Sequence, residues 1–389
     1  MPERTSDTAA RGPLAGRTVI ELAGIGPGPF AGMLLADMGA DVIRVERPGA
    51  SAPQGSAWTD VTNRGKRSVV LDLKKPAAVE AVLALVERAD VIFEGNRPGV
   101  VERLGLGPED VWKRNPKIVY GRMTGWGQDG PLAPTAGHDI GYIAITGALG
   151  SMGDPDVPPQ IPLNLVGDFG GGSMYLVTGI LAALLEAERT GRGQVVDAAI
   201  VDGAANLLAT VHALMAQDRW VDRRGSNLLD GGTPYYSVYE TADGRHMAVG
   251  PIEPKFYAEL LRLLQVDPAE AAPADQNDRS TWPALRSILA GRFATRTQAE
   301  WTAVFEGTDA CVAPVLGLRG ALQHPHIAAR GTLVEVEGVL QPGPAPRFSA
   351  HPVSTPVEPP TPGRDTRAVL SEAGLDAEAL LSAGAAVQA

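Results

Sequence analysis

Two polar residues in the middle of the sequence could act together in proton transfer. His138 follows a Gly/Pro-rich loop and stands at the expected start of an apolar helix. Asp168 lies between an apolar strand-like run and the glycines at 170–172, which would let a bulky ligand approach the backbone beside the carboxylate. Imidazole and carboxyl groups are both common general acids and bases. Taken alone, His138 with Asp139 favours a helix cap over catalysis, and Asp168 also fits a helix N-cap.

A third candidate, Glu253, is a lone acidic residue in the proline-containing turn 250–254 and by itself indicates no chemistry. The signatures of serine hydrolases and of phosphoryl transfer, Gly-x-Ser-x-Gly and the Walker loop, are missing from the sequence. The six histidines include no His-Glu-x-x-His or similar metal spacing, and Cys311 is the only cysteine. The sequence therefore predicts no metal site and excludes an intrachain disulfide.

A glycine-rich turn at 24–29 joins the first predicted strand to the first predicted helix. Such a turn can hold a dinucleotide phosphate at the helix N-terminus. Its spacing is Gly-x-Gly-x-Gly-Pro rather than Gly-x-Gly-x-x-Gly, and Pro27 and Pro29 each remove a backbone N–H that a phosphate would need. The pattern therefore favours a tight strand-to-helix turn over a nicotinamide site.

Basic residues recur near the ends of the predicted strands. They are Arg44, Arg47, Arg64, Lys66, Arg67, Lys74, Lys75, Arg97 and Arg103. In a doubly wound sheet the ends of successive strands line one crevice, so these charges could converge there on the phosphates of a nucleotide-like group. The alternative is that they are solvated surface charges, and the residues alone leave both interpretations open.

Strands and helices alternate through the first half of the chain. The strand-like runs lie at 18–22, 41–45, 68–73, 90–94, 117–120 and 195–198, and the helical patterns at 30–38, 77–88, 174–188 and 204–215. This order predicts an α/β fold with a doubly wound parallel sheet.

The second half predicts a smaller α+β unit from 237 to about 315, with a hairpin around 242–244 and helices at 256–264 and 301–306. A proline-rich run at 341–362 is expected to be extended. The expected domains are a disordered N-terminal extension over 1–13, a large domain made of 14–218 and 322–389, a linker over 219–236 and a small domain over 237–321.

Composition narrows the class of protein. The chain has 389 residues, of which 44% are apolar, which is enough for a large core divided between two domains. Its formal net charge of −11 argues against nucleic acid as a bulk partner, and no run of 18 uninterrupted apolar residues indicates a membrane span. The first residues lack the apolar region of a secretory signal, and the C-terminus is not a Ser-Lys-Leu address. We therefore expect a cytoplasmic protein with no nucleic-acid or membrane partner.

Several motifs in order resemble those of the α-methylacyl-CoA racemases, a branch of the family III CoA-transferase superfamily. The likeness runs from about Leu14 to about Pro362 and is specific because so many motifs occur together. The segments that carry it are 19–29, 44–48, 66–68, 71–74, 137–140, 164–172, 190–194, 227–232 and 248–254. The resemblance implies an interlocked homodimer, in which each large domain faces the partner's small domain.

The resemblance also assigns the site residue by residue. The catalytic carboxylate of the transferases falls on Asp168, and the histidine and glutamate of the racemase branch fall on His138 and Glu253. The CoA part of the substrate, with no separate cofactor, would be held by Arg47, Leu71, Asp72, Leu73, Lys74, Asn96, Arg97, Arg103, Gly137, Asp139, Ile140, Gly141 and Tyr142. One departure is Gly141, where the racemases usually carry Asn before the tyrosine that matches Tyr142.

The implied reaction interconverts (2R)- and (2S)-2-methylacyl-CoA thioesters by 1,1-proton transfer through an enolate, within fatty acid metabolism. Neutral His138 would remove the α-proton on one face while protonated Asp168 returns one on the other, and the roles swap in reverse. Glu253 would orient the imidazole and stabilise its charged form, within one subunit or across the dimer. Backbone N–H groups at the start of the helix near Asp139 would stabilise the enolate oxygen.

Two other functions stay compatible with the sequence. A family III CoA-transferase would use Asp168 as a nucleophile that forms an acyl anhydride, and it would need neither His138 nor Glu253. A non-catalytic acyl-CoA-binding protein would need none of the three residues. The acyl group stays open, since sterol side chains, branched fatty acids and arylpropionyl groups are all compatible.

Overall fold

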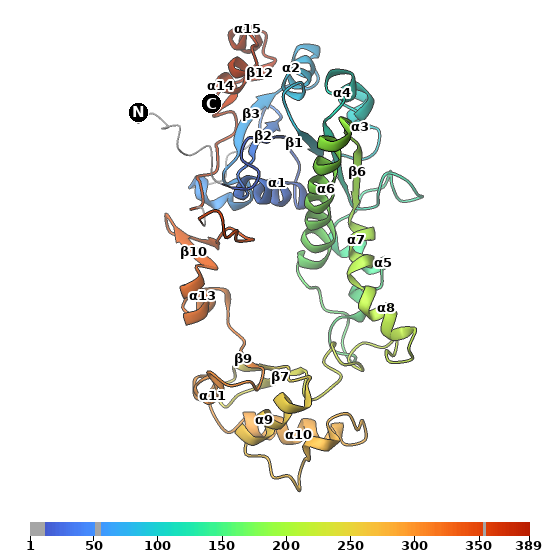
Figure 1. Cartoon of the computed structure of the whole chain (residues 1–389), viewed down its shortest axis with the longest axis vertical. Helices are drawn as coiled ribbons and strands as arrows, with labels where there is room; N and C mark the ends of the chain where they lie inside the picture. Colours follow the sequence, from blue (N-terminus) through green and yellow to red (C-terminus); the bar gives the residue numbers. More distant parts are fainter. Residues whose placement is uncertain (1–11, 51–55, 353–354) are drawn as a thin grey trace. The chain divides into compact units, whose positions relative to one another are not determined.

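The computed structural model describes residues 12–50, 56–352 and 355–389 (Figure 1). The predicted N-terminal extension, 1–13, lies outside the described residues except for its last two. The chain forms two compact units: one holds Leu163–Leu207 and His324–Ala389 with the residues up to Thr146, and the other holds Gly147–Pro162 and Leu208–Gln323. Compared with the predicted boundaries, 147–162 and 208–236 group with the second unit.

A seven-stranded sheet forms the centre of the first unit. Its order is β12-β3-β2-β1-β4-β5-β6, and all neighbours are parallel except β12 and β3 at the edge. The strands are β1 (Thr18–Leu22), β2 (Asp41–Glu46), β3 (Arg67–Leu71), β4 (Val91–Glu94), β5 (Val119–Thr124), β6 (Val195–Ala199) and β12 (Ala386–Val387). The chain runs outward from β1 to β3 and then restarts at β4 on the other side of β1. The order therefore reverses between β1 and β4, where a crevice opens at the carboxyl ends of the strands.

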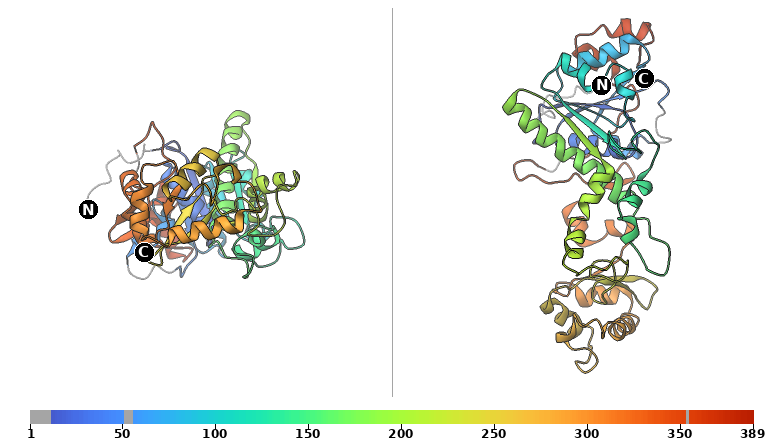
Figure 2. Two further views of the ribbon diagram at one scale, coloured as in Figure 1. Left: turned by 90° about the horizontal axis from the view of Figure 1, so that it is seen from below. Right: turned by 90° about the vertical axis from the view of Figure 1, so that its right-hand side faces the viewer.

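Helices cover both faces of this sheet, which confirms the predicted doubly wound α/β fold. Ile20 packs into the core on one face and its neighbour Val19 into the core on the other. The first core contains α2 (Pro76–Val86), α3 (Val100–Arg103), α4 (Pro108–Arg114), α14 (Thr366–Glu372) and α15 (Ala377–Ser382). The second contains α1 (Pro27–Asp37) and α6 (Met174–Thr190), the long green helix beside the strands in Figure 2. Burial on both faces explains why the strands are almost continuously apolar.

The predicted elements of this unit are present, with some ends moved. Helix α1 begins at Pro27 rather than at residue 30, because proline is well tolerated in the first turn, where its missing N–H has no partner to lose. The single helix predicted over 204–215 is two helices, α7 (Ile200–Leu207) and α8 (Ala209–Met215), and α8 belongs to the second unit.

Two short segments carry the polar residues of the first unit. Helix α5 (Asp139–Ile145) follows the long loop after β5. Leu165–Ser173, here called the 165–173 segment, is a π-helical stretch that continues directly into α6, and its Phe169 N–H donates to the Asn164 carbonyl at 3.2 Å. Its glycines bring α7 close, because a Cβ added at Gly171 would collide with the backbone of α7. π-Helical turns of this kind often occur at functional sites.

The 165–173 segment and α6 together form a continuous helix of 26 residues, Leu165–Thr190, that is long and apolar enough to cross a membrane. Some of its apolar side chains, among them Leu176 and Ile180, are buried against the sheet, whereas Leu165, Met174 and Leu185 are exposed. A core helix has the same composition, so this helix by itself is weak evidence for a membrane span.

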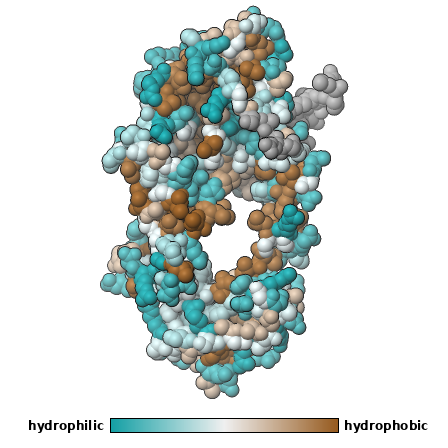
Figure 3. All heavy atoms as spheres, turned by 180° about the vertical axis from the view of Figure 1, so that it is seen from behind, coloured by the Kyte–Doolittle hydropathy of each residue, from teal (hydrophilic) through white to brown (hydrophobic). Residues whose placement is uncertain are grey.

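Exposed apolar side chains gather on three neighbouring elements of the first unit. Ile145 on α5, Leu165 in the 165–173 segment and Leu207 on α7 are each at least half exposed, and the three elements pack against one another. Figure 3 shows apolar areas of this kind, in brown, among the teal polar residues of the surface. Apolar side chains exposed next to one another commonly mark an interaction surface.

The second unit has its own aromatic core. An antiparallel sheet of β7 (Ser237–Glu240), β8 (His246–Val249) and β9 (Val312–Pro314) packs with α9 (Pro254–Leu263), α10 (Trp282–Phe293) and α11 (Gln298–Phe305) around Tyr239, Phe293 and Trp301. The predicted hairpin and the predicted helices α9 and α11 are confirmed, while α10 was not predicted. Helix α12 (Leu318–Leu322) also lies in this unit, and α13 (Pro325–Arg330) and the β10–β11 hairpin (Leu333–Val336, Val339–Pro342) belong to the first.

Candidate active site

A cavity of about 350 Å³ lies at the switch point of the large sheet. Its walls come from the segments after β1, β4 and β5, from α5 and from the 165–173 segment. The lining residues include Gly24–Gly28, Gly95–Pro98, Gly125, Trp126, Gly137, His138, Tyr142 and Asp168. The structure therefore brings the two predicted proton carriers, His138 and Asp168, into one cavity.

Asp168 lies inside the 165–173 segment, so the prediction that it caps the following helix is wrong. Its carboxyl group is half-buried and accepts a 3.4 Å hydrogen bond from Asn164 Nδ2. Burial raises the pKa of Asp168, and the nearby Asp139 acts in the same direction against the opposing effects of Asn164 and His138. The net increase extends the pH range in which Asp168 is protonated and able to donate.

His138 occupies the N-cap position of α5, but its imidazole makes no capping hydrogen bond. Only its backbone serves the helix, since the His138 carbonyl accepts the Gly141 N–H at 2.8 Å. The side chain is exposed at the cavity. The helix-cap interpretation is therefore wrong for the imidazole, which is left free to meet a ligand.

Two aromatic rings make a close-packed wall next to His138. Tyr142 is buried with its ring edge against Trp126, at 4.7 Å between ring centroids. A Cβ added at Gly125 or at Gly137 would collide with the Tyr142 ring, so both positions need glycine for space. Gly141 differs, because a Cβ there would meet only Trp126, at an ordinary contact distance of 4.0 Å.

The loop after β4 is held by a buried carboxyl group that the sequence analysis did not single out. Glu94 ends β4, is 2% exposed, and accepts the Asn96 N–H at 2.6 Å. Burial raises the pKa of Glu94 to about 7. The interaction fixes Gly95–Pro98, which places Asn96 and Arg97 in the cavity wall. An acidic residue that ends a fully apolar strand was the sequence signal available for it.

The predicted basic cluster divides into two groups. Arg44 and Lys66 pair with Glu21, Arg64 pairs with Asp37, Arg67 pairs with Asp41 and Glu372, and Lys75 donates to the Ala383 carbonyl. These five residues serve the fold, so convergence on a ligand, one of the two interpretations that the sequence left open, does not apply to them. The exposed Arg47, Lys74, Arg97 and Arg103 have no ion-pair partner among the described residues. They follow β2, β3 and β4, and Arg97 lines the cavity.

The remaining predicted CoA contacts differ in their exposure. Leu71 is wholly buried in the core, so only its backbone could face a ligand. Leu73 packs against the same core, and Asp72 accepts the Lys74 N–H at 3.2 Å in the turn after β3. Ile140 is exposed on α5.

Glu253 lies in the second unit, at the N-cap of α9, with an exposed side chain that makes no capping hydrogen bond. Its pairing with His138 stays a prediction, because the two residues belong to different units.

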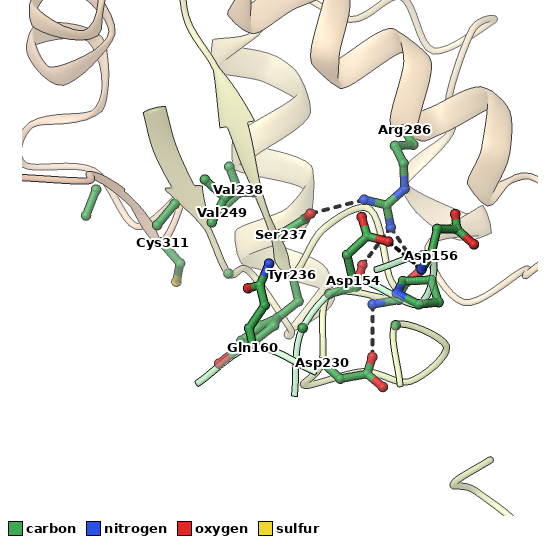
Figure 4. Close-up of a pocket in the computed structure, with 18 residues that line it drawn as sticks. Asp154, Asp156, Gln160, Asp230, Tyr236, Ser237, Val238, Val249, Arg286 and Cys311 are labelled. Carbon is green, nitrogen blue, oxygen red and sulfur yellow. Dashed lines mark hydrogen bonds between the residues drawn. The ribbon is translucent and has the colours of Figure 1, made fainter. Parts of the chain in front are cut away.

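A larger cavity, of about 1010 Å³, lies within the second unit (Figure 4). The basic residue in its lining, Arg286, donates to Ser237 Oγ at 3.0 Å and to the Gly231 carbonyl at 2.8 Å. Asp154, Asp156 and Asp230 also line this cavity, and none of the predicted site residues does. The switch-point cavity, with its histidine and its carboxyl group of raised pKa, is therefore the candidate active site.

Residues 14–366 match the family described as CoA-transferase family III. The chain is a member of this family. The alpha-methylacyl-CoA racemase of Mus musculus is 45% identical to this family III protein over 370 residues, or 95% of each chain, and that of Homo sapiens is 42% identical over 94% of each. A crystal structure of a CAIB/BAIF family protein from Brucella suis covers 93% of this chain and all of its own, with 28% identity and a TM-score of 0.80.

The two racemases match the family III protein over nearly its whole length, which makes it an enzyme of the isomerase class. The comparisons also confirm the family that the sequence motifs resemble.

Proposed function

We propose that this protein is a racemase that interconverts (2R)- and (2S)-2-methylacyl-CoA thioesters. The observation that carries the proposal is the position of His138 and Asp168, which come from separate segments and line one cavity at the switch point. The similarity to the mouse and human racemases supports the same reaction. One proton leaves C2 and one returns to it on the opposite face, so the atoms balance with no cofactor beyond the CoA of the substrate.

The two proton carriers suit their roles. Asp168 has a raised pKa and can deliver a proton, and the exposed imidazole of His138 can accept one. Removal of the α-proton places negative charge on the thioester oxygen. The N–H groups of Asp139 and Ile140, at the start of α5, have no acceptor among the described residues and would stabilise this enolate.

The CoA group would lie along the carboxyl edge of the sheet. Arg97 in the cavity wall and the unpaired Arg47, Lys74 and Arg103 would bind its phosphates, because guanidinium and ammonium groups form charge-assisted hydrogen bonds with phosphate oxygens. Arg47, Lys74 and Arg97 follow parallel strands, and Arg103 is the last residue of the short helix α3.

Glu253 would orient the imidazole of His138 and stabilise its charged form, from the same chain or from a second copy. The exposed apolar side chains on α5, the 165–173 segment and α7 support a homodimer. We also propose that the enzyme is cytoplasmic and acts in fatty acid metabolism.

Incubation of one pure epimer of a 2-methylacyl-CoA with the enzyme in heavy water tests this function. A racemase inverts the epimer and incorporates deuterium at C2 with no other substrate present. Turnover that requires a second carboxylic acid would instead identify a CoA-transferase that uses Asp168 as a nucleophile. Binding without exchange or inversion would identify an acyl-CoA-binding protein.

A further inference from the structure

The side chain of Asp139 contacts the backbone of Asp168, which lines the candidate active site. The Asp168 N–H donates to Asp139 Oδ1 at 2.7 Å. The second oxygen of Asp139, Oδ2, is buried and has no hydrogen-bond partner in the part of the chain that the structure describes. A buried acceptor without a partner is uncommon and costs free energy, so this arrangement calls for a reason.

Gly167 makes room for the contact. A Cβ at this position would collide with Asp139 Oδ1 and come within 3.0 Å of Ile143 Cγ2. Gly167 is buried, and its backbone is not in the left-handed region, so space rather than conformational freedom is what glycine provides here. The sequence thus gives up a side chain at the position that lets Asp139 approach Asp168.

We propose that Asp139 is a positioning residue that fixes the backbone of Asp168 through this hydrogen bond and, as a second negative charge near it, favours the protonated form of the Asp168 carboxyl group. Asp139 then acts through Asp168 rather than on the substrate. This assignment rests on the proposed racemase function, and it explains how an aspartate at the surface of an open cavity could act as the proton donor of the pair.

The charges around Asp168 agree with this role. Burial is the largest cause of the raised pKa of Asp168, and on α5 and its N-cap Asp139 acts in the same direction and His138 in the opposite one. Tyr142 lies on the same helix, and the charge of Asp168 raises its pKa in turn. Arg97, on the loop after β4, lowers the pKa of Tyr142 through its positive charge. Asn164, in the same chain segment as Asp168, opposes this effect, because its hydrogen bond lowers the pKa of Asp168.

Asp139→Asn tests the proposal, because asparagine keeps the Oδ1 acceptor for the Asp168 N–H and removes the charge. The midpoint of the Asp168 titration should fall to a lower pH. It can be isolated as the difference in infrared carboxyl absorption between each protein and its Asp168→Asn counterpart. The pH profile of kcat should shift downward by the same amount with KM nearly unchanged.

Asp202→Asn is the matched control, since Asp202 is an exposed carboxylate on α7 with no hydrogen bond or ion pair to Asp168, and it should leave the midpoint unchanged. Gly167→Ala, which forces Asp139 away, should lower the midpoint as Asp139→Asn does. An unchanged Asp168 midpoint in folded Asp139→Asn would overturn the proposal. The infrared titration needs no turnover, so it decides the role of Asp139 even if the unmodified enzyme fails to racemise.

Discussion

Lys66 Nζ lies 2.7 Å from Glu21 Oε2, and both side chains are fully buried under helix α1. Lys66 also donates to the Pro29 carbonyl at 2.9 Å, while Arg44 pairs with Glu21 and donates to the Gly24 carbonyl at 3.2 Å. The two cations therefore hold both ends of the turn that lines the cavity. Gly32 is needed for this arrangement, because a Cβ there would collide with Glu21.

Glu21→Gln should lower the free energy of unfolding by about 3–5 kcal/mol, because it removes the countercharge of the buried Lys66 and leaves the buried Arg44 only its ion pair with Glu46 among the described residues. Chemical denaturation of the two proteins measures the difference. Arg114→Ala breaks an exposed ion pair with Glu80 and should change stability far less. Equal effects of the two substitutions would show that burial does not govern the Glu21 network.

Glu94→Gln should stabilise the protein at high pH and not at low pH. The pKa of Glu94 is raised from 4.5 to about 7, so between these values the folded protein keeps a proton that the unfolded chain has lost. Stability therefore falls as pH rises through this interval. Above pH 7 the substitution should raise the free energy of unfolding by on the order of 3 kcal/mol, and below pH 4.5 it should leave that free energy unchanged. Thermal unfolding across this pH range, with the exposed Glu109→Gln as control, measures the effect, and a pH-independent difference would contradict it.

Arg47→Ala and Arg103→Ala should each raise KM for the acyl-CoA severalfold with little change in kcat, because phosphate contacts bind the ground state and the transition state alike. Lys113→Ala is the control, since Lys113 is an exposed cation that pairs with Asp110 on α4. Steady-state kinetics with one substrate separates the two constants. A loss in kcat at constant KM would place these arginines at the reacting carbon instead.

Glu253→Gln should slow turnover in both directions and alter the acidic limb of the pH–rate profile. The substitution keeps the shape and hydrogen bonding of the side chain but removes the charge that would support imidazolium at His138. A transferase that uses Asp168 as a nucleophile has no such requirement. Full activity with an unchanged profile would make Glu253 a structural residue only.

The order of strands and helices could be predicted because each strand is buried on both faces and reads as a short apolar run between helical patterns. The hairpin around 242–244 could also be predicted from the sequence. Helix α10 was missed, and its hydrophobic pattern shows why: Leu285, Leu289 and Phe293 are buried, but alanine, glycine and two arginines interrupt the rest of the helix.

The structure places His138 and Asp168 in one cavity, but the surroundings of several candidate residues could not be predicted from the sequence. A glycine run after Asp168 suggested a ligand approach, but Gly171 and Gly172 instead bring α7 and Met123 close to the segment. Arg44 and Lys66 look in sequence like Arg47 and Lys74, which have no ion pair within the described part of the chain, and only the fold shows that Glu21 neutralises the first two. Ion pairs between residues more than twenty positions apart leave no local signal.

Exchange of the α-proton by single-site variants in heavy water tests the two-carrier account most directly. His138→Ala and Asp168→Ala should each lower racemisation by several orders of magnitude, because each removes one of two obligatory carriers. Each variant should still exchange the C2 proton of one epimer, the one whose C2 proton faces the remaining carrier, without inverting that epimer. The two variants should therefore exchange the protons of opposite epimers. Near-normal racemisation by either variant, or exchange of the C2 proton in the same epimer by both variants, would contradict the account.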